Sequence, residues 1–517
     1  MVFLLPGFTD DHIDESAGSI WFYCRCLGSN SYPGFCVVSV CCLQNNSMIR
    51  ILICFFGILM APALSAESRS MSDKLMQVKS FTADNGLHVI FHHRDDSDTF
   101  TAQLVVNLGL QDFSCKDRQA PHLLEHMLLE GTTRFDRKTL RQRIRNLGGK
   151  TKAYTREEST YYTISLHSDY PDIALDTLHS VISEPRFNKQ DFITSKQIIH
   201  AEQGSNSNST SPFGKPIPVL TEMAKAQLFK GTELYCDNLS SPDHLRLDYI
   251  KALYRDHYVA SNMTLIVIGH FDEQAILELI GSRFMALPML PEPKHNPIPR
   301  WQPDYATINA RNALFNPEAN LHLYLPGVGS TDPLADYYEI IAEYFSEQLY
   351  YEVRGAKGLG YTPRAHLDNT TRYGYIEATT KTTSRWLPEA QQSFVDLYQQ
   401  LQKKGIPEKD VERIKAKLVL EFESKQRDHD ELASIYRRNR FQIRETGKMP
   451  DFVANIKQVN AGKLNQVIAT RFPPNPLIAT HVRPSLYLTV LQFVLISMVV
   501  TAMIWPLLRR LRKRNQS

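Results

Sequence analysis

A run of prolines near the middle of the chain constrains its fold more than any other feature. Six prolines fall within the sixteen residues 288–303. Proline fixes one backbone torsion and lacks an amide donor, so this density excludes a helix or a central strand. With 517 residues, the chain is also too long for one compact core. We therefore predict a linker at 288–304 between two domains, at 72–287 and 305–484.

Both predicted domains alternate between strand-like and helix-like segments. In the first, residues 99–108 are β-rich, and the helical pattern at 137–147 ends at Gly148. In the second, residues 321–325 are β-rich, and the helical pattern at 388–404 also ends at a glycine. This recurrence predicts an α+β fold of two similar α/β-sandwich domains, related by internal duplication.

Charge and cysteine content exclude some classes of protein. Lys and Arg number 58 and Asp and Glu 55, a net charge of +3. A nucleic-acid partner is not predicted, because such proteins carry a strong basic excess. Six of the eight cysteines lie before residue 55 without C-x-x-C spacing, so a zinc ribbon is not predicted there. The remaining two, Cys115 and Cys236, could form one disulfide.

The N-terminal region has the pattern of a targeting segment. Met48 and Arg50 precede an apolar run at 51–60, and small residues follow. This order predicts a secretory signal peptide at 48–66. An uncleaved membrane anchor is the alternative. Residues 1–47 are then either an upstream extension or the product of a start site placed too early.

The C-terminal region predicts a membrane anchor. Residues 485–508 carry no charge, which is enough to span a bilayer as a helix. The segment 509–517 is basic, so we expect it to be cytoplasmic. We thus expect a single-pass protein of the bacterial inner membrane with a periplasmic body. In a eukaryote the body would be luminal.

The segment His122-Leu123-Leu124-Glu125-His126 carries the strongest chemical signal. On a helix the two histidines lie one turn apart on one face and can bind one Zn²⁺. Glu125 borders that face and can take a proton from metal-bound water, whose pKa the ion lowers. H-x-x-E-H is the inverted zincin arrangement. The alternative is a pair of surface histidines, which the apolar flanking residues disfavour.

The segment PHLLEHMLLEGT at 121–132 resembles the signature of the pitrilysin/insulinase family of zinc metallopeptidases (inverzincins). In that family the third zinc ligand is a Glu about seventy-five residues beyond the second histidine, on another helix. Glu202 lies 76 residues after His126. The resemblance therefore implies that His122, His126 and Glu202 bind zinc. His200 is the competing candidate, but its side chain faces elsewhere on a helix.

Other residues extend the resemblance or depart from it. Arg354 and Tyr361 resemble an Arg and a Tyr, seven apart, that contact substrate in the family. Such an Arg donates to a peptide carbonyl, and the Tyr hydroxyl stabilises an oxyanion. Taken alone, the two residues read as a helix end and a turn. Lys152 stands where members usually have Asn, and Ser195 where many have an acidic residue.

These features predict a membrane-anchored zinc metalloendopeptidase that hydrolyses peptides or small unfolded proteins, with Glu125 as general base. The alternative is a non-catalytic member that holds substrate or supports a partner subunit. The chain resembles the short, two-domain members such as the mitochondrial processing peptidases. Longer members close four such domains around the substrate. We therefore expect a homodimer or pairing with a related subunit.

Overall fold

The computed structural model describes residues 21–25, 37–41, 78–206, 220–236, 240–293, 295, 298, 301–311, 318–483 and 486–514. The chain divides into two compact units, Met1–Ser68 and Arg69–Ser517. In the first unit, β1 (Trp21–Arg25) pairs with β2 (Val37–Cys41) in antiparallel fashion. All other elements belong to the second unit.

The first sheet of the second unit has six strands in the order β3-β4-β8-β5-β7-β6. Its strands are β3 (Lys79–Thr82), β4 (His88–His93), β5 (Thr99–Val106), β6 (Lys150–Thr155), β7 (Thr160–His167) and β8 (Met263–Gly269). Only β4 and β8 pair in parallel. Every residue of β8 is buried, as its continuous apolar sequence requires of a strand covered on both faces.

The second sheet repeats this topology with five strands in the order β11-β12-β10-β13-β9. Its strands are β9 (Ile308–Arg311), β10 (Glu318–Pro326), β11 (Tyr361–Asn369), β12 (Gly374–Thr383) and β13 (Leu477–Arg483). Here β9 and β13 form the parallel pair, as β4 and β8 do in the first sheet. The prediction of two similar α/β domains is confirmed. The boundaries proposed from the prolines stay predictions.

Helices connect the strands in a matching order. The first domain contains η1 (Leu110–Asp112), α2 (Ala120–Leu129), α3 (Arg137–Arg145), α4 (Pro171–Ser183), α5 (Lys189–Asn206), α6 (Leu220–Leu228), α7 (Leu247–His257), η2 (Ala260–Asn262) and α8 (Glu273–Phe284). The second contains α9 (Ala335–Leu349), η3 (Tyr350–Ala356), α10 (Leu387–Lys404), α11 (Glu408–Lys425), α12 (His429–Thr446), α13 (Phe452–Gln458) and α14 (Ala461–Arg471). The final helix is α15 (Leu486–Arg514). Helix α9 takes the place of α2 in the repeat but carries no histidine.

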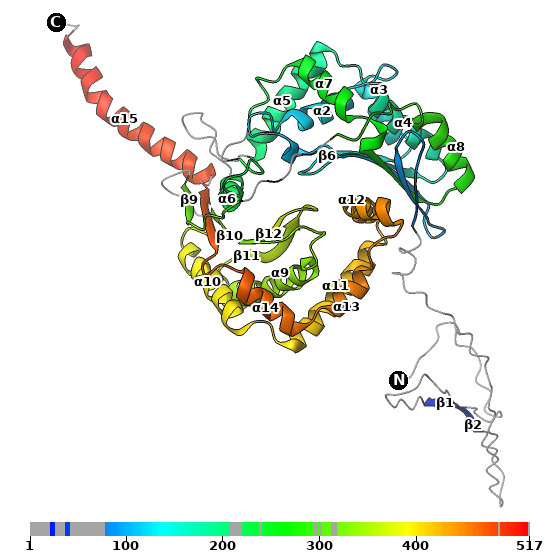
Figure 1. Cartoon of the computed structure of the whole chain (residues 1–517). Helices are drawn as coiled ribbons and strands as arrows, with labels where there is room; N and C mark the ends of the chain where they lie inside the picture. Colours follow the sequence, from blue (N-terminus) through cyan, green and yellow to red (C-terminus); the bar gives the residue numbers. More distant parts are fainter. Residues whose placement is uncertain are drawn as a thin grey trace, which may run out of the picture. The chain divides into compact units, whose positions relative to one another are not determined.

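Each sheet is covered on one face by a helix from the other domain. Leu432 and Tyr436 of α12 pack against Ile90 and Ile266 of the first sheet, all of them buried. In return, α6 of the first domain packs on the second sheet, where Leu228 meets Tyr324. Figure 1 shows α12 under the first sheet and α6 beside β10. Besides the core of each domain, two further apolar clusters are therefore built from residues of both domains.

Polar contacts reinforce this shared packing. The Tyr436 hydroxyl lies 2.7 Å from Nδ1 of His92 in β4. Nη1 of Arg94 donates to the Gln426 carbonyl oxygen at 2.7 Å, in a buried position. Because burial strengthens hydrogen bonds and makes their loss costly, the Tyr436 contact holds α12, and the Arg94 contact holds the end of α11, against the first sheet.

The structure contradicts the predicted membrane anchor. Among the residues described, no helix is both long enough and apolar enough to cross a bilayer. Helix α15 covers 485–508 from its second residue, contains Pro506 and continues to Arg514. The predicted membrane-spanning helix, cytoplasmic tail at 509–517 and single-pass inner-membrane location are therefore wrong. The predicted signal peptide at 48–66 lies outside the described residues.

Candidate metal centre

Helix α2 contains the H-x-x-E-H segment and lies at the edge of the core of the first domain. Pro121 stands in its first turn, where the missing amide hydrogen costs nothing. Leu124, Met127 and Leu128 are buried in the core of the first domain. The opposite side of the helix then carries the two histidines. Gly131, with φ of +146°, ends this stretch in a conformation that favours glycine.

Three candidate ligands converge beside α2. Nε2 of His122 lies 3.1 Å from Nε2 of His126. Oε2 of Glu202, which α5 supplies, lies 3.4 Å from each of these nitrogens. In a tetrahedral zinc site with bonds near 2.05 Å, neighbouring ligand atoms are about 3.3 Å apart. The three atoms therefore fit one face of such a tetrahedron and leave the fourth position open.

The histidine rings are held in the form that binds a metal. The Gln119 side-chain oxygen can only accept, so Nδ1 of His122 donates to it at 3.0 Å. That bond leaves the lone pair of the His122 ring on Nε2, which faces the other ligands. Burial lowers the pKa of His122 and of His126 to about 4. Both rings are thus neutral near pH 7, as metal ligation requires.

Glu125 lies beside these ligands and is buried, with only 5% of its surface exposed. Thr155, at the end of β6, donates its hydroxyl to Oε2 of Glu125 at 2.7 Å. Burial raises the pKa of Glu125 to about 7, and the Thr155 bond partly offsets this rise. A carboxylate with such a pKa is suited to accept a proton near neutral pH.

The structure separates Glu202 from its competitor His200. The His200 ring bonds through Nε2 to Oδ1 of Asp243 at 2.8 Å, away from α2. Ser195, on the same helix, is fully buried, and its hydroxyl has no partner among the described residues. At this position the chain therefore offers no carboxylate to orient the ligands.

The other departure from the family pattern has a structural explanation. Nζ of Lys152 lies 2.5 Å from Oδ2 of Asp430 at the start of α12. Lys152 therefore joins β6 to the second domain. Both side chains are about two-fifths exposed, so this ion pair stabilises the domain contact only weakly.

Arg354 and Tyr361 lie together in the second domain, apart from the H-x-x-E-H cluster. The Arg354 guanidinium stacks 5.1 Å from the centre of the Tyr361 ring, which is 67% exposed. Among the described residues, no hydrogen bond or ion pair links either one to His122, Glu125 or His126. Thr362 has φ of +57°, which is strained for a β-branched residue, and β11 has an irregular register there.

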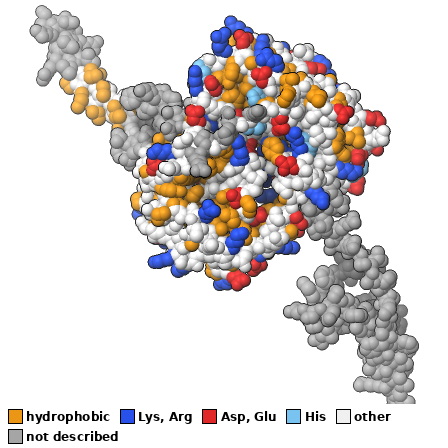
Figure 2. Space-filling model, viewed as in Figure 1, with side chains coloured by type: hydrophobic (Ala, Val, Ile, Leu, Met, Phe, Trp, Pro, Cys, Tyr) orange, Lys and Arg blue, Asp and Glu red, His pale blue; other side chains and the backbone are white. Residues whose placement is uncertain are grey.

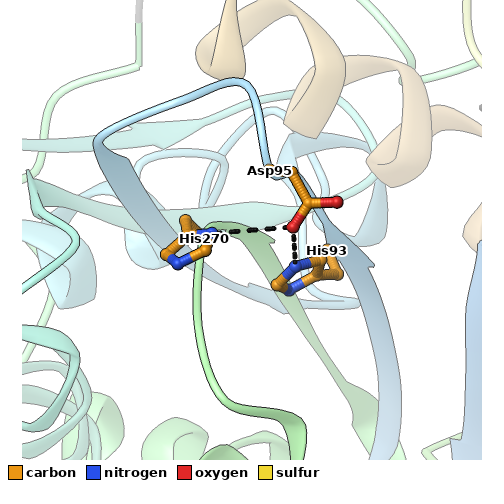
Figure 3. Close-up of side chains that lie close together, drawn as sticks. All are labelled: His93, Asp95 and His270. Atoms are coloured by element: carbon orange, nitrogen blue, oxygen red, sulfur yellow. Dashed lines mark hydrogen bonds and ion pairs between the residues drawn. The ribbon is translucent and has the colours of Figure 1, made fainter.

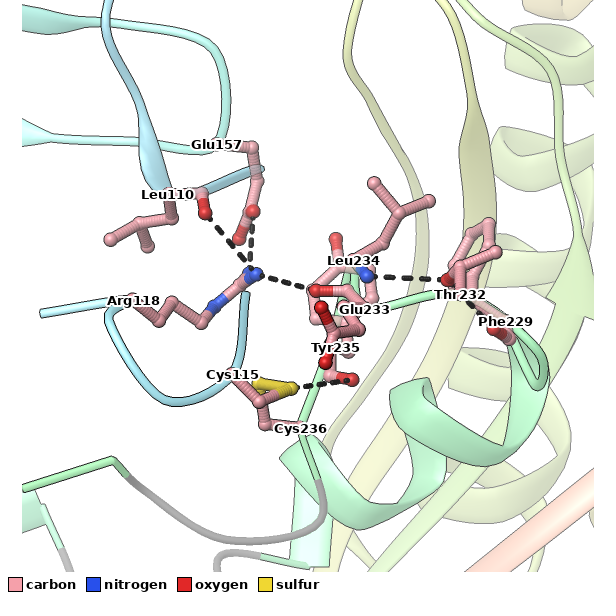
Figure 4. The surroundings of a disulfide bond; sticks show 10 residues. All are labelled: Leu110, Cys115, Arg118, Glu157, Phe229, Thr232, Glu233, Leu234, Tyr235 and Cys236. Atoms are coloured by element: carbon pink, nitrogen blue, oxygen red, sulfur yellow. Dashed lines mark hydrogen bonds and ion pairs between the residues drawn. A yellow bond between two sulfur atoms is a disulfide. The ribbon is translucent and has the colours of Figure 1, made fainter. Parts of the chain in front are cut away.

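A disulfide anchors the entrance to α2. Cys115 lies five residues before the helix begins and forms a disulfide with Cys236 (Figure 4). Arg118 lies between Cys115 and α2 in the sequence. Its Nη2 lies 2.7 Å from Oε2 of Glu157, and its Nη1 donates to the Glu233 carbonyl oxygen at 3.2 Å. Arg118 is itself buried. The approach to the candidate metal centre is thus fixed by both a covalent bond and charged hydrogen bonds.

A cavity of about 460 Å³ lies between the two domains and reaches Thr155. The β6–β7 turn contributes Arg156 and Glu158 to its wall, and α12 contributes Arg437 and Arg440. Figure 2 shows the molecule hollowed between the two domains on this face. The cavity therefore reaches the residue whose hydroxyl binds the Glu125 carboxylate.

Sequence reasoning did not assign roles to Gln119 and Thr155. The signal for Gln119 was available, because a residue three positions before His122 lies next to it on a helix. Thr155 is thirty residues from Glu125, and only the pairing of β6 with β7 brings it there.

Family comparisons match both halves of the chain. Residues 88–234, which contain the candidate ligands and Glu125, match the family described as Insulinase (Peptidase family M16). Residues 244–418 match the Peptidase M16 inactive domain.

Individual relatives are distant. The β-subunit of the mitochondrial-processing peptidase of Lentinula edodes is 25% identical over 41% of this chain and 45% of its own length. An uncharacterized zinc protease of Bacillus subtilis is 19% identical over 67% of this chain and 85% of its own. The chain spans less than half the length of the first curated relatives it matches.

Solved structures share the fold. A protease from Helicobacter pylori superposes with a TM-score of 0.68 and 17% identity, covering 80% of this chain and all of that one. Pitrilysin superposes with a TM-score of 0.62 and 18% identity, but this chain covers only 45% of it.

Replacing both cysteines, Cys115→Ser with Cys236→Ser, should lower the free energy of unfolding by about 2–5 kcal/mol. The bond closes a separation of 121 residues, so its loss gives the unfolded chain much more freedom. Urea unfolding of the variant and the wild type would measure the difference. A reductant should destabilise the wild type and leave the variant unchanged; equal stability without reductant would contradict the role of the bond.

Proposed function

Because the chain belongs to the insulinase family of peptidases (family M16), we propose that it is a zinc metalloendopeptidase. The observation that carries this proposal is the convergence of His122, His126 and Glu202 beside a buried Glu125. Two neutral imidazoles, one carboxylate and an open fourth position are the donor set of a catalytic zinc site. Peptides and small unfolded proteins are the proposed substrates.

The residues of this chain divide the chemistry among them. Zinc held by the three ligands would supply a Lewis acid that polarises the scissile carbonyl and makes water more acidic. Glu125 would accept the proton of the attacking water and return it to the leaving amine. Thr155 keeps the Glu125 carboxylate oriented, and Gln119 keeps His122 in the required tautomer.

The first sheet offers a place for an extended substrate. Strand β6 lies at the edge of that sheet, and its side chains are exposed or half-buried. An edge strand has unpaired backbone groups that can add a peptide as a further strand. Since β6 ends at Thr155, a peptide paired with it would run past Glu125.

The second reading is a non-catalytic member that holds substrate for a partner subunit. It would bind zinc and peptide but would not hydrolyse the peptide bond. The second domain fits a supporting role in either case, because residues 244–418, which include much of it, match the inactive domain of the family, and α9 lacks histidines. Activity of the purified chain distinguishes the two readings.

Glu125→Gln should reduce peptide hydrolysis by at least about 10²-fold while zinc binding is retained. The amide keeps the shape and the Thr155 contact but cannot accept a proton. Hydrolysis of a quenched fluorescent peptide and zinc content by atomic emission would be measured on the same sample. Exposed Glu278→Gln serves as the control and should change neither quantity. Wild-type rates in Glu125→Gln would contradict the proposed base.

Glu202→Ala should lose the zinc ion of this centre, whereas His200→Ala should keep it. The two residues are neighbours on α5, but only Glu202 faces His122 and His126. Removing one of three protein ligands should greatly weaken binding. Zinc content after dialysis against a weak chelator gives the comparison. The reverse result would assign the third ligand to His200.

We further propose that the active form is a pair of subunits, because two relatives of this chain are named as the β-subunit of a mitochondrial-processing peptidase. Two copies related by two-fold symmetry would enclose a chamber between them. Arg354 and Tyr361 of one copy would then face the zinc ligands of the other. Their exposure in this chain and the strained Thr362 beside them fit a surface that functions when covered.

Mixing Glu125→Gln with Tyr361→Phe should restore part of the activity. Each homodimer should be impaired, since one lacks the base and the other a hydroxyl that stabilises the oxyanion, worth about 10²-fold or more. A heterodimer would contain one site with both groups. Recovery is followed by peptide hydrolysis after subunit exchange, which a tagged copy verifies. No recovery despite exchange would exclude action across the dimer, and a purely monomeric active enzyme would exclude the dimer.

A further inference from the structure

A second group of metal-binding side chains lies at another edge of the first sheet. His93 ends β4, and His270 directly follows β8. The two strands are parallel, with His93 opposite Gly269, and the Arg94 amide donates to the Gly269 carbonyl at 2.8 Å. Because main-chain bonds fix both strand ends, the two histidines are held next to each other.

Asp95 completes the group (Figure 3). Its Oδ1 lies 2.7 Å from Nε2 of His93 and 3.8 Å from Nδ1 of His270. The two rings are 5.3 Å apart between centroids. One ligand atom from each residue lies within 4.8 Å of the other two. All three residues are exposed, so an ion could reach them from solvent and keep water as its remaining ligands.

This group is separate from the candidate zinc centre. Thr155, which holds Glu125, pairs with Thr160, and Thr160 pairs with Val106. Val106 in turn pairs with Met263, the first residue of β8, whereas His270 follows the last. Seven residues of strand span about 20 Å. The two groups therefore lie at opposite ends of β8.

We propose that His93, Asp95 and His270 form a second site for a divalent first-row transition metal, with Zn²⁺ as the probe ion. Two imidazoles and one carboxylate suit zinc and its neighbours, whereas calcium and magnesium prefer mainly oxygen ligands. Tetrahedral ligands would be about 3.3 Å apart, so Asp95 must withdraw slightly from His93. Its side chain is 87% exposed and is free to do so.

Stability alone does not account for the convergence. Exposed ion pairs contribute little to folding, so nothing requires two histidines to share one carboxylate there. The chain contains an ordinary version of the same pair: His167 and Asp169 have the same spacing and lie 3.1 Å apart. Among the described residues, no second histidine lies close enough to that pair to form a group of three ligands with it.

A metal at this second site would brace the contact between the domains. Arg94 stands between His93 and Asp95, and its guanidinium reaches both Asp96 and the Gln426 carbonyl of the second domain. Fixing the side chains on either side of Arg94 would fix the turn from which this contact is made. The second site therefore has a structural role, distinct from hydrolysis.

The test is the zinc stoichiometry of the full chain after equilibrium dialysis against Zn²⁺ of known concentration. The wild type should bind two equivalents. Asp95→Asn and His270→Ala should each bind one, and so should His122→Ala, which lacks the other site. The control His167→Ala with Asp169→Asn should still bind two. Unchanged thermal unfolding midpoints of the metal-free variants would show that they fold.

The outcomes separate the two sites. One equivalent in the wild type, lost in His122→Ala, would overturn this inference and leave the proposed function intact. Two equivalents retained in both Asp95→Asn and His270→Ala would also overturn it. Cu²⁺ added to His122→Ala should show nitrogen hyperfine splitting in its electron paramagnetic resonance spectrum. The double variant His122→Ala with His270→Ala should lose this splitting, and an unchanged spectrum would contradict the proposed ligand set.

Discussion

The first sheet would present an apolar face to water if α12 did not cover it. Ile90, Ile266 and Ile268 point to that face, and α12 of the second domain buries them. Each large apolar side chain removed from water stabilises the fold by about 1.5–3 kcal/mol. The second sheet depends in the same way on α6. Since helix α6 follows α5 as α12 follows α11, the repeated topology carries a repeated exchange, and each half completes the other.

The candidate metal centre depends indirectly on this exchange of helices, through the first core and strand β6. Helix α2 is rigid because its apolar side lies in the first core, and that core requires a covered sheet. Strand β6 carries Thr155 to Glu125 and Lys152 to Asp430 of α12. The strand that orients the base is therefore also the strand that touches the second domain. A shift of α12 would displace β6 through Lys152 and would therefore move Thr155 on the same short strand.

Much of this arrangement was readable from the sequence, because local signals were strong. The H-x-x-E-H spacing placed two histidines on one helix face, and the family resemblance pointed to Glu202, which lies within 3.4 Å of both. The two-domain α/β fold followed from repeated alternation of strands and helices. The membrane helix was predicted from a long uncharged stretch followed by basic residues, but no helix among the residues described is long enough and apolar enough to cross a bilayer.

Other features could not be predicted because they depend on distant pairing. Strand β13 lies between β10 and β9, although it is more than a hundred residues from either in sequence. The exchange of α6 and α12 has no local signature, since an amphipathic helix does not specify which sheet it covers. The convergence of His93 with His270 likewise requires the parallel pairing of β4 with β8.

The Cys115–Cys236 bond encloses a segment that includes His122, Glu125, His126 and Glu202. A cut in any single peptide bond between the two cysteines would open this ring without separating the chain into two molecules. All four side chains would stay on one covalently connected molecule, because the disulfide would still join the two fragments. For a chain proposed to cleave peptides, this means that one accidental nick by another copy would leave the pieces of its centre tethered together and able to remain assembled.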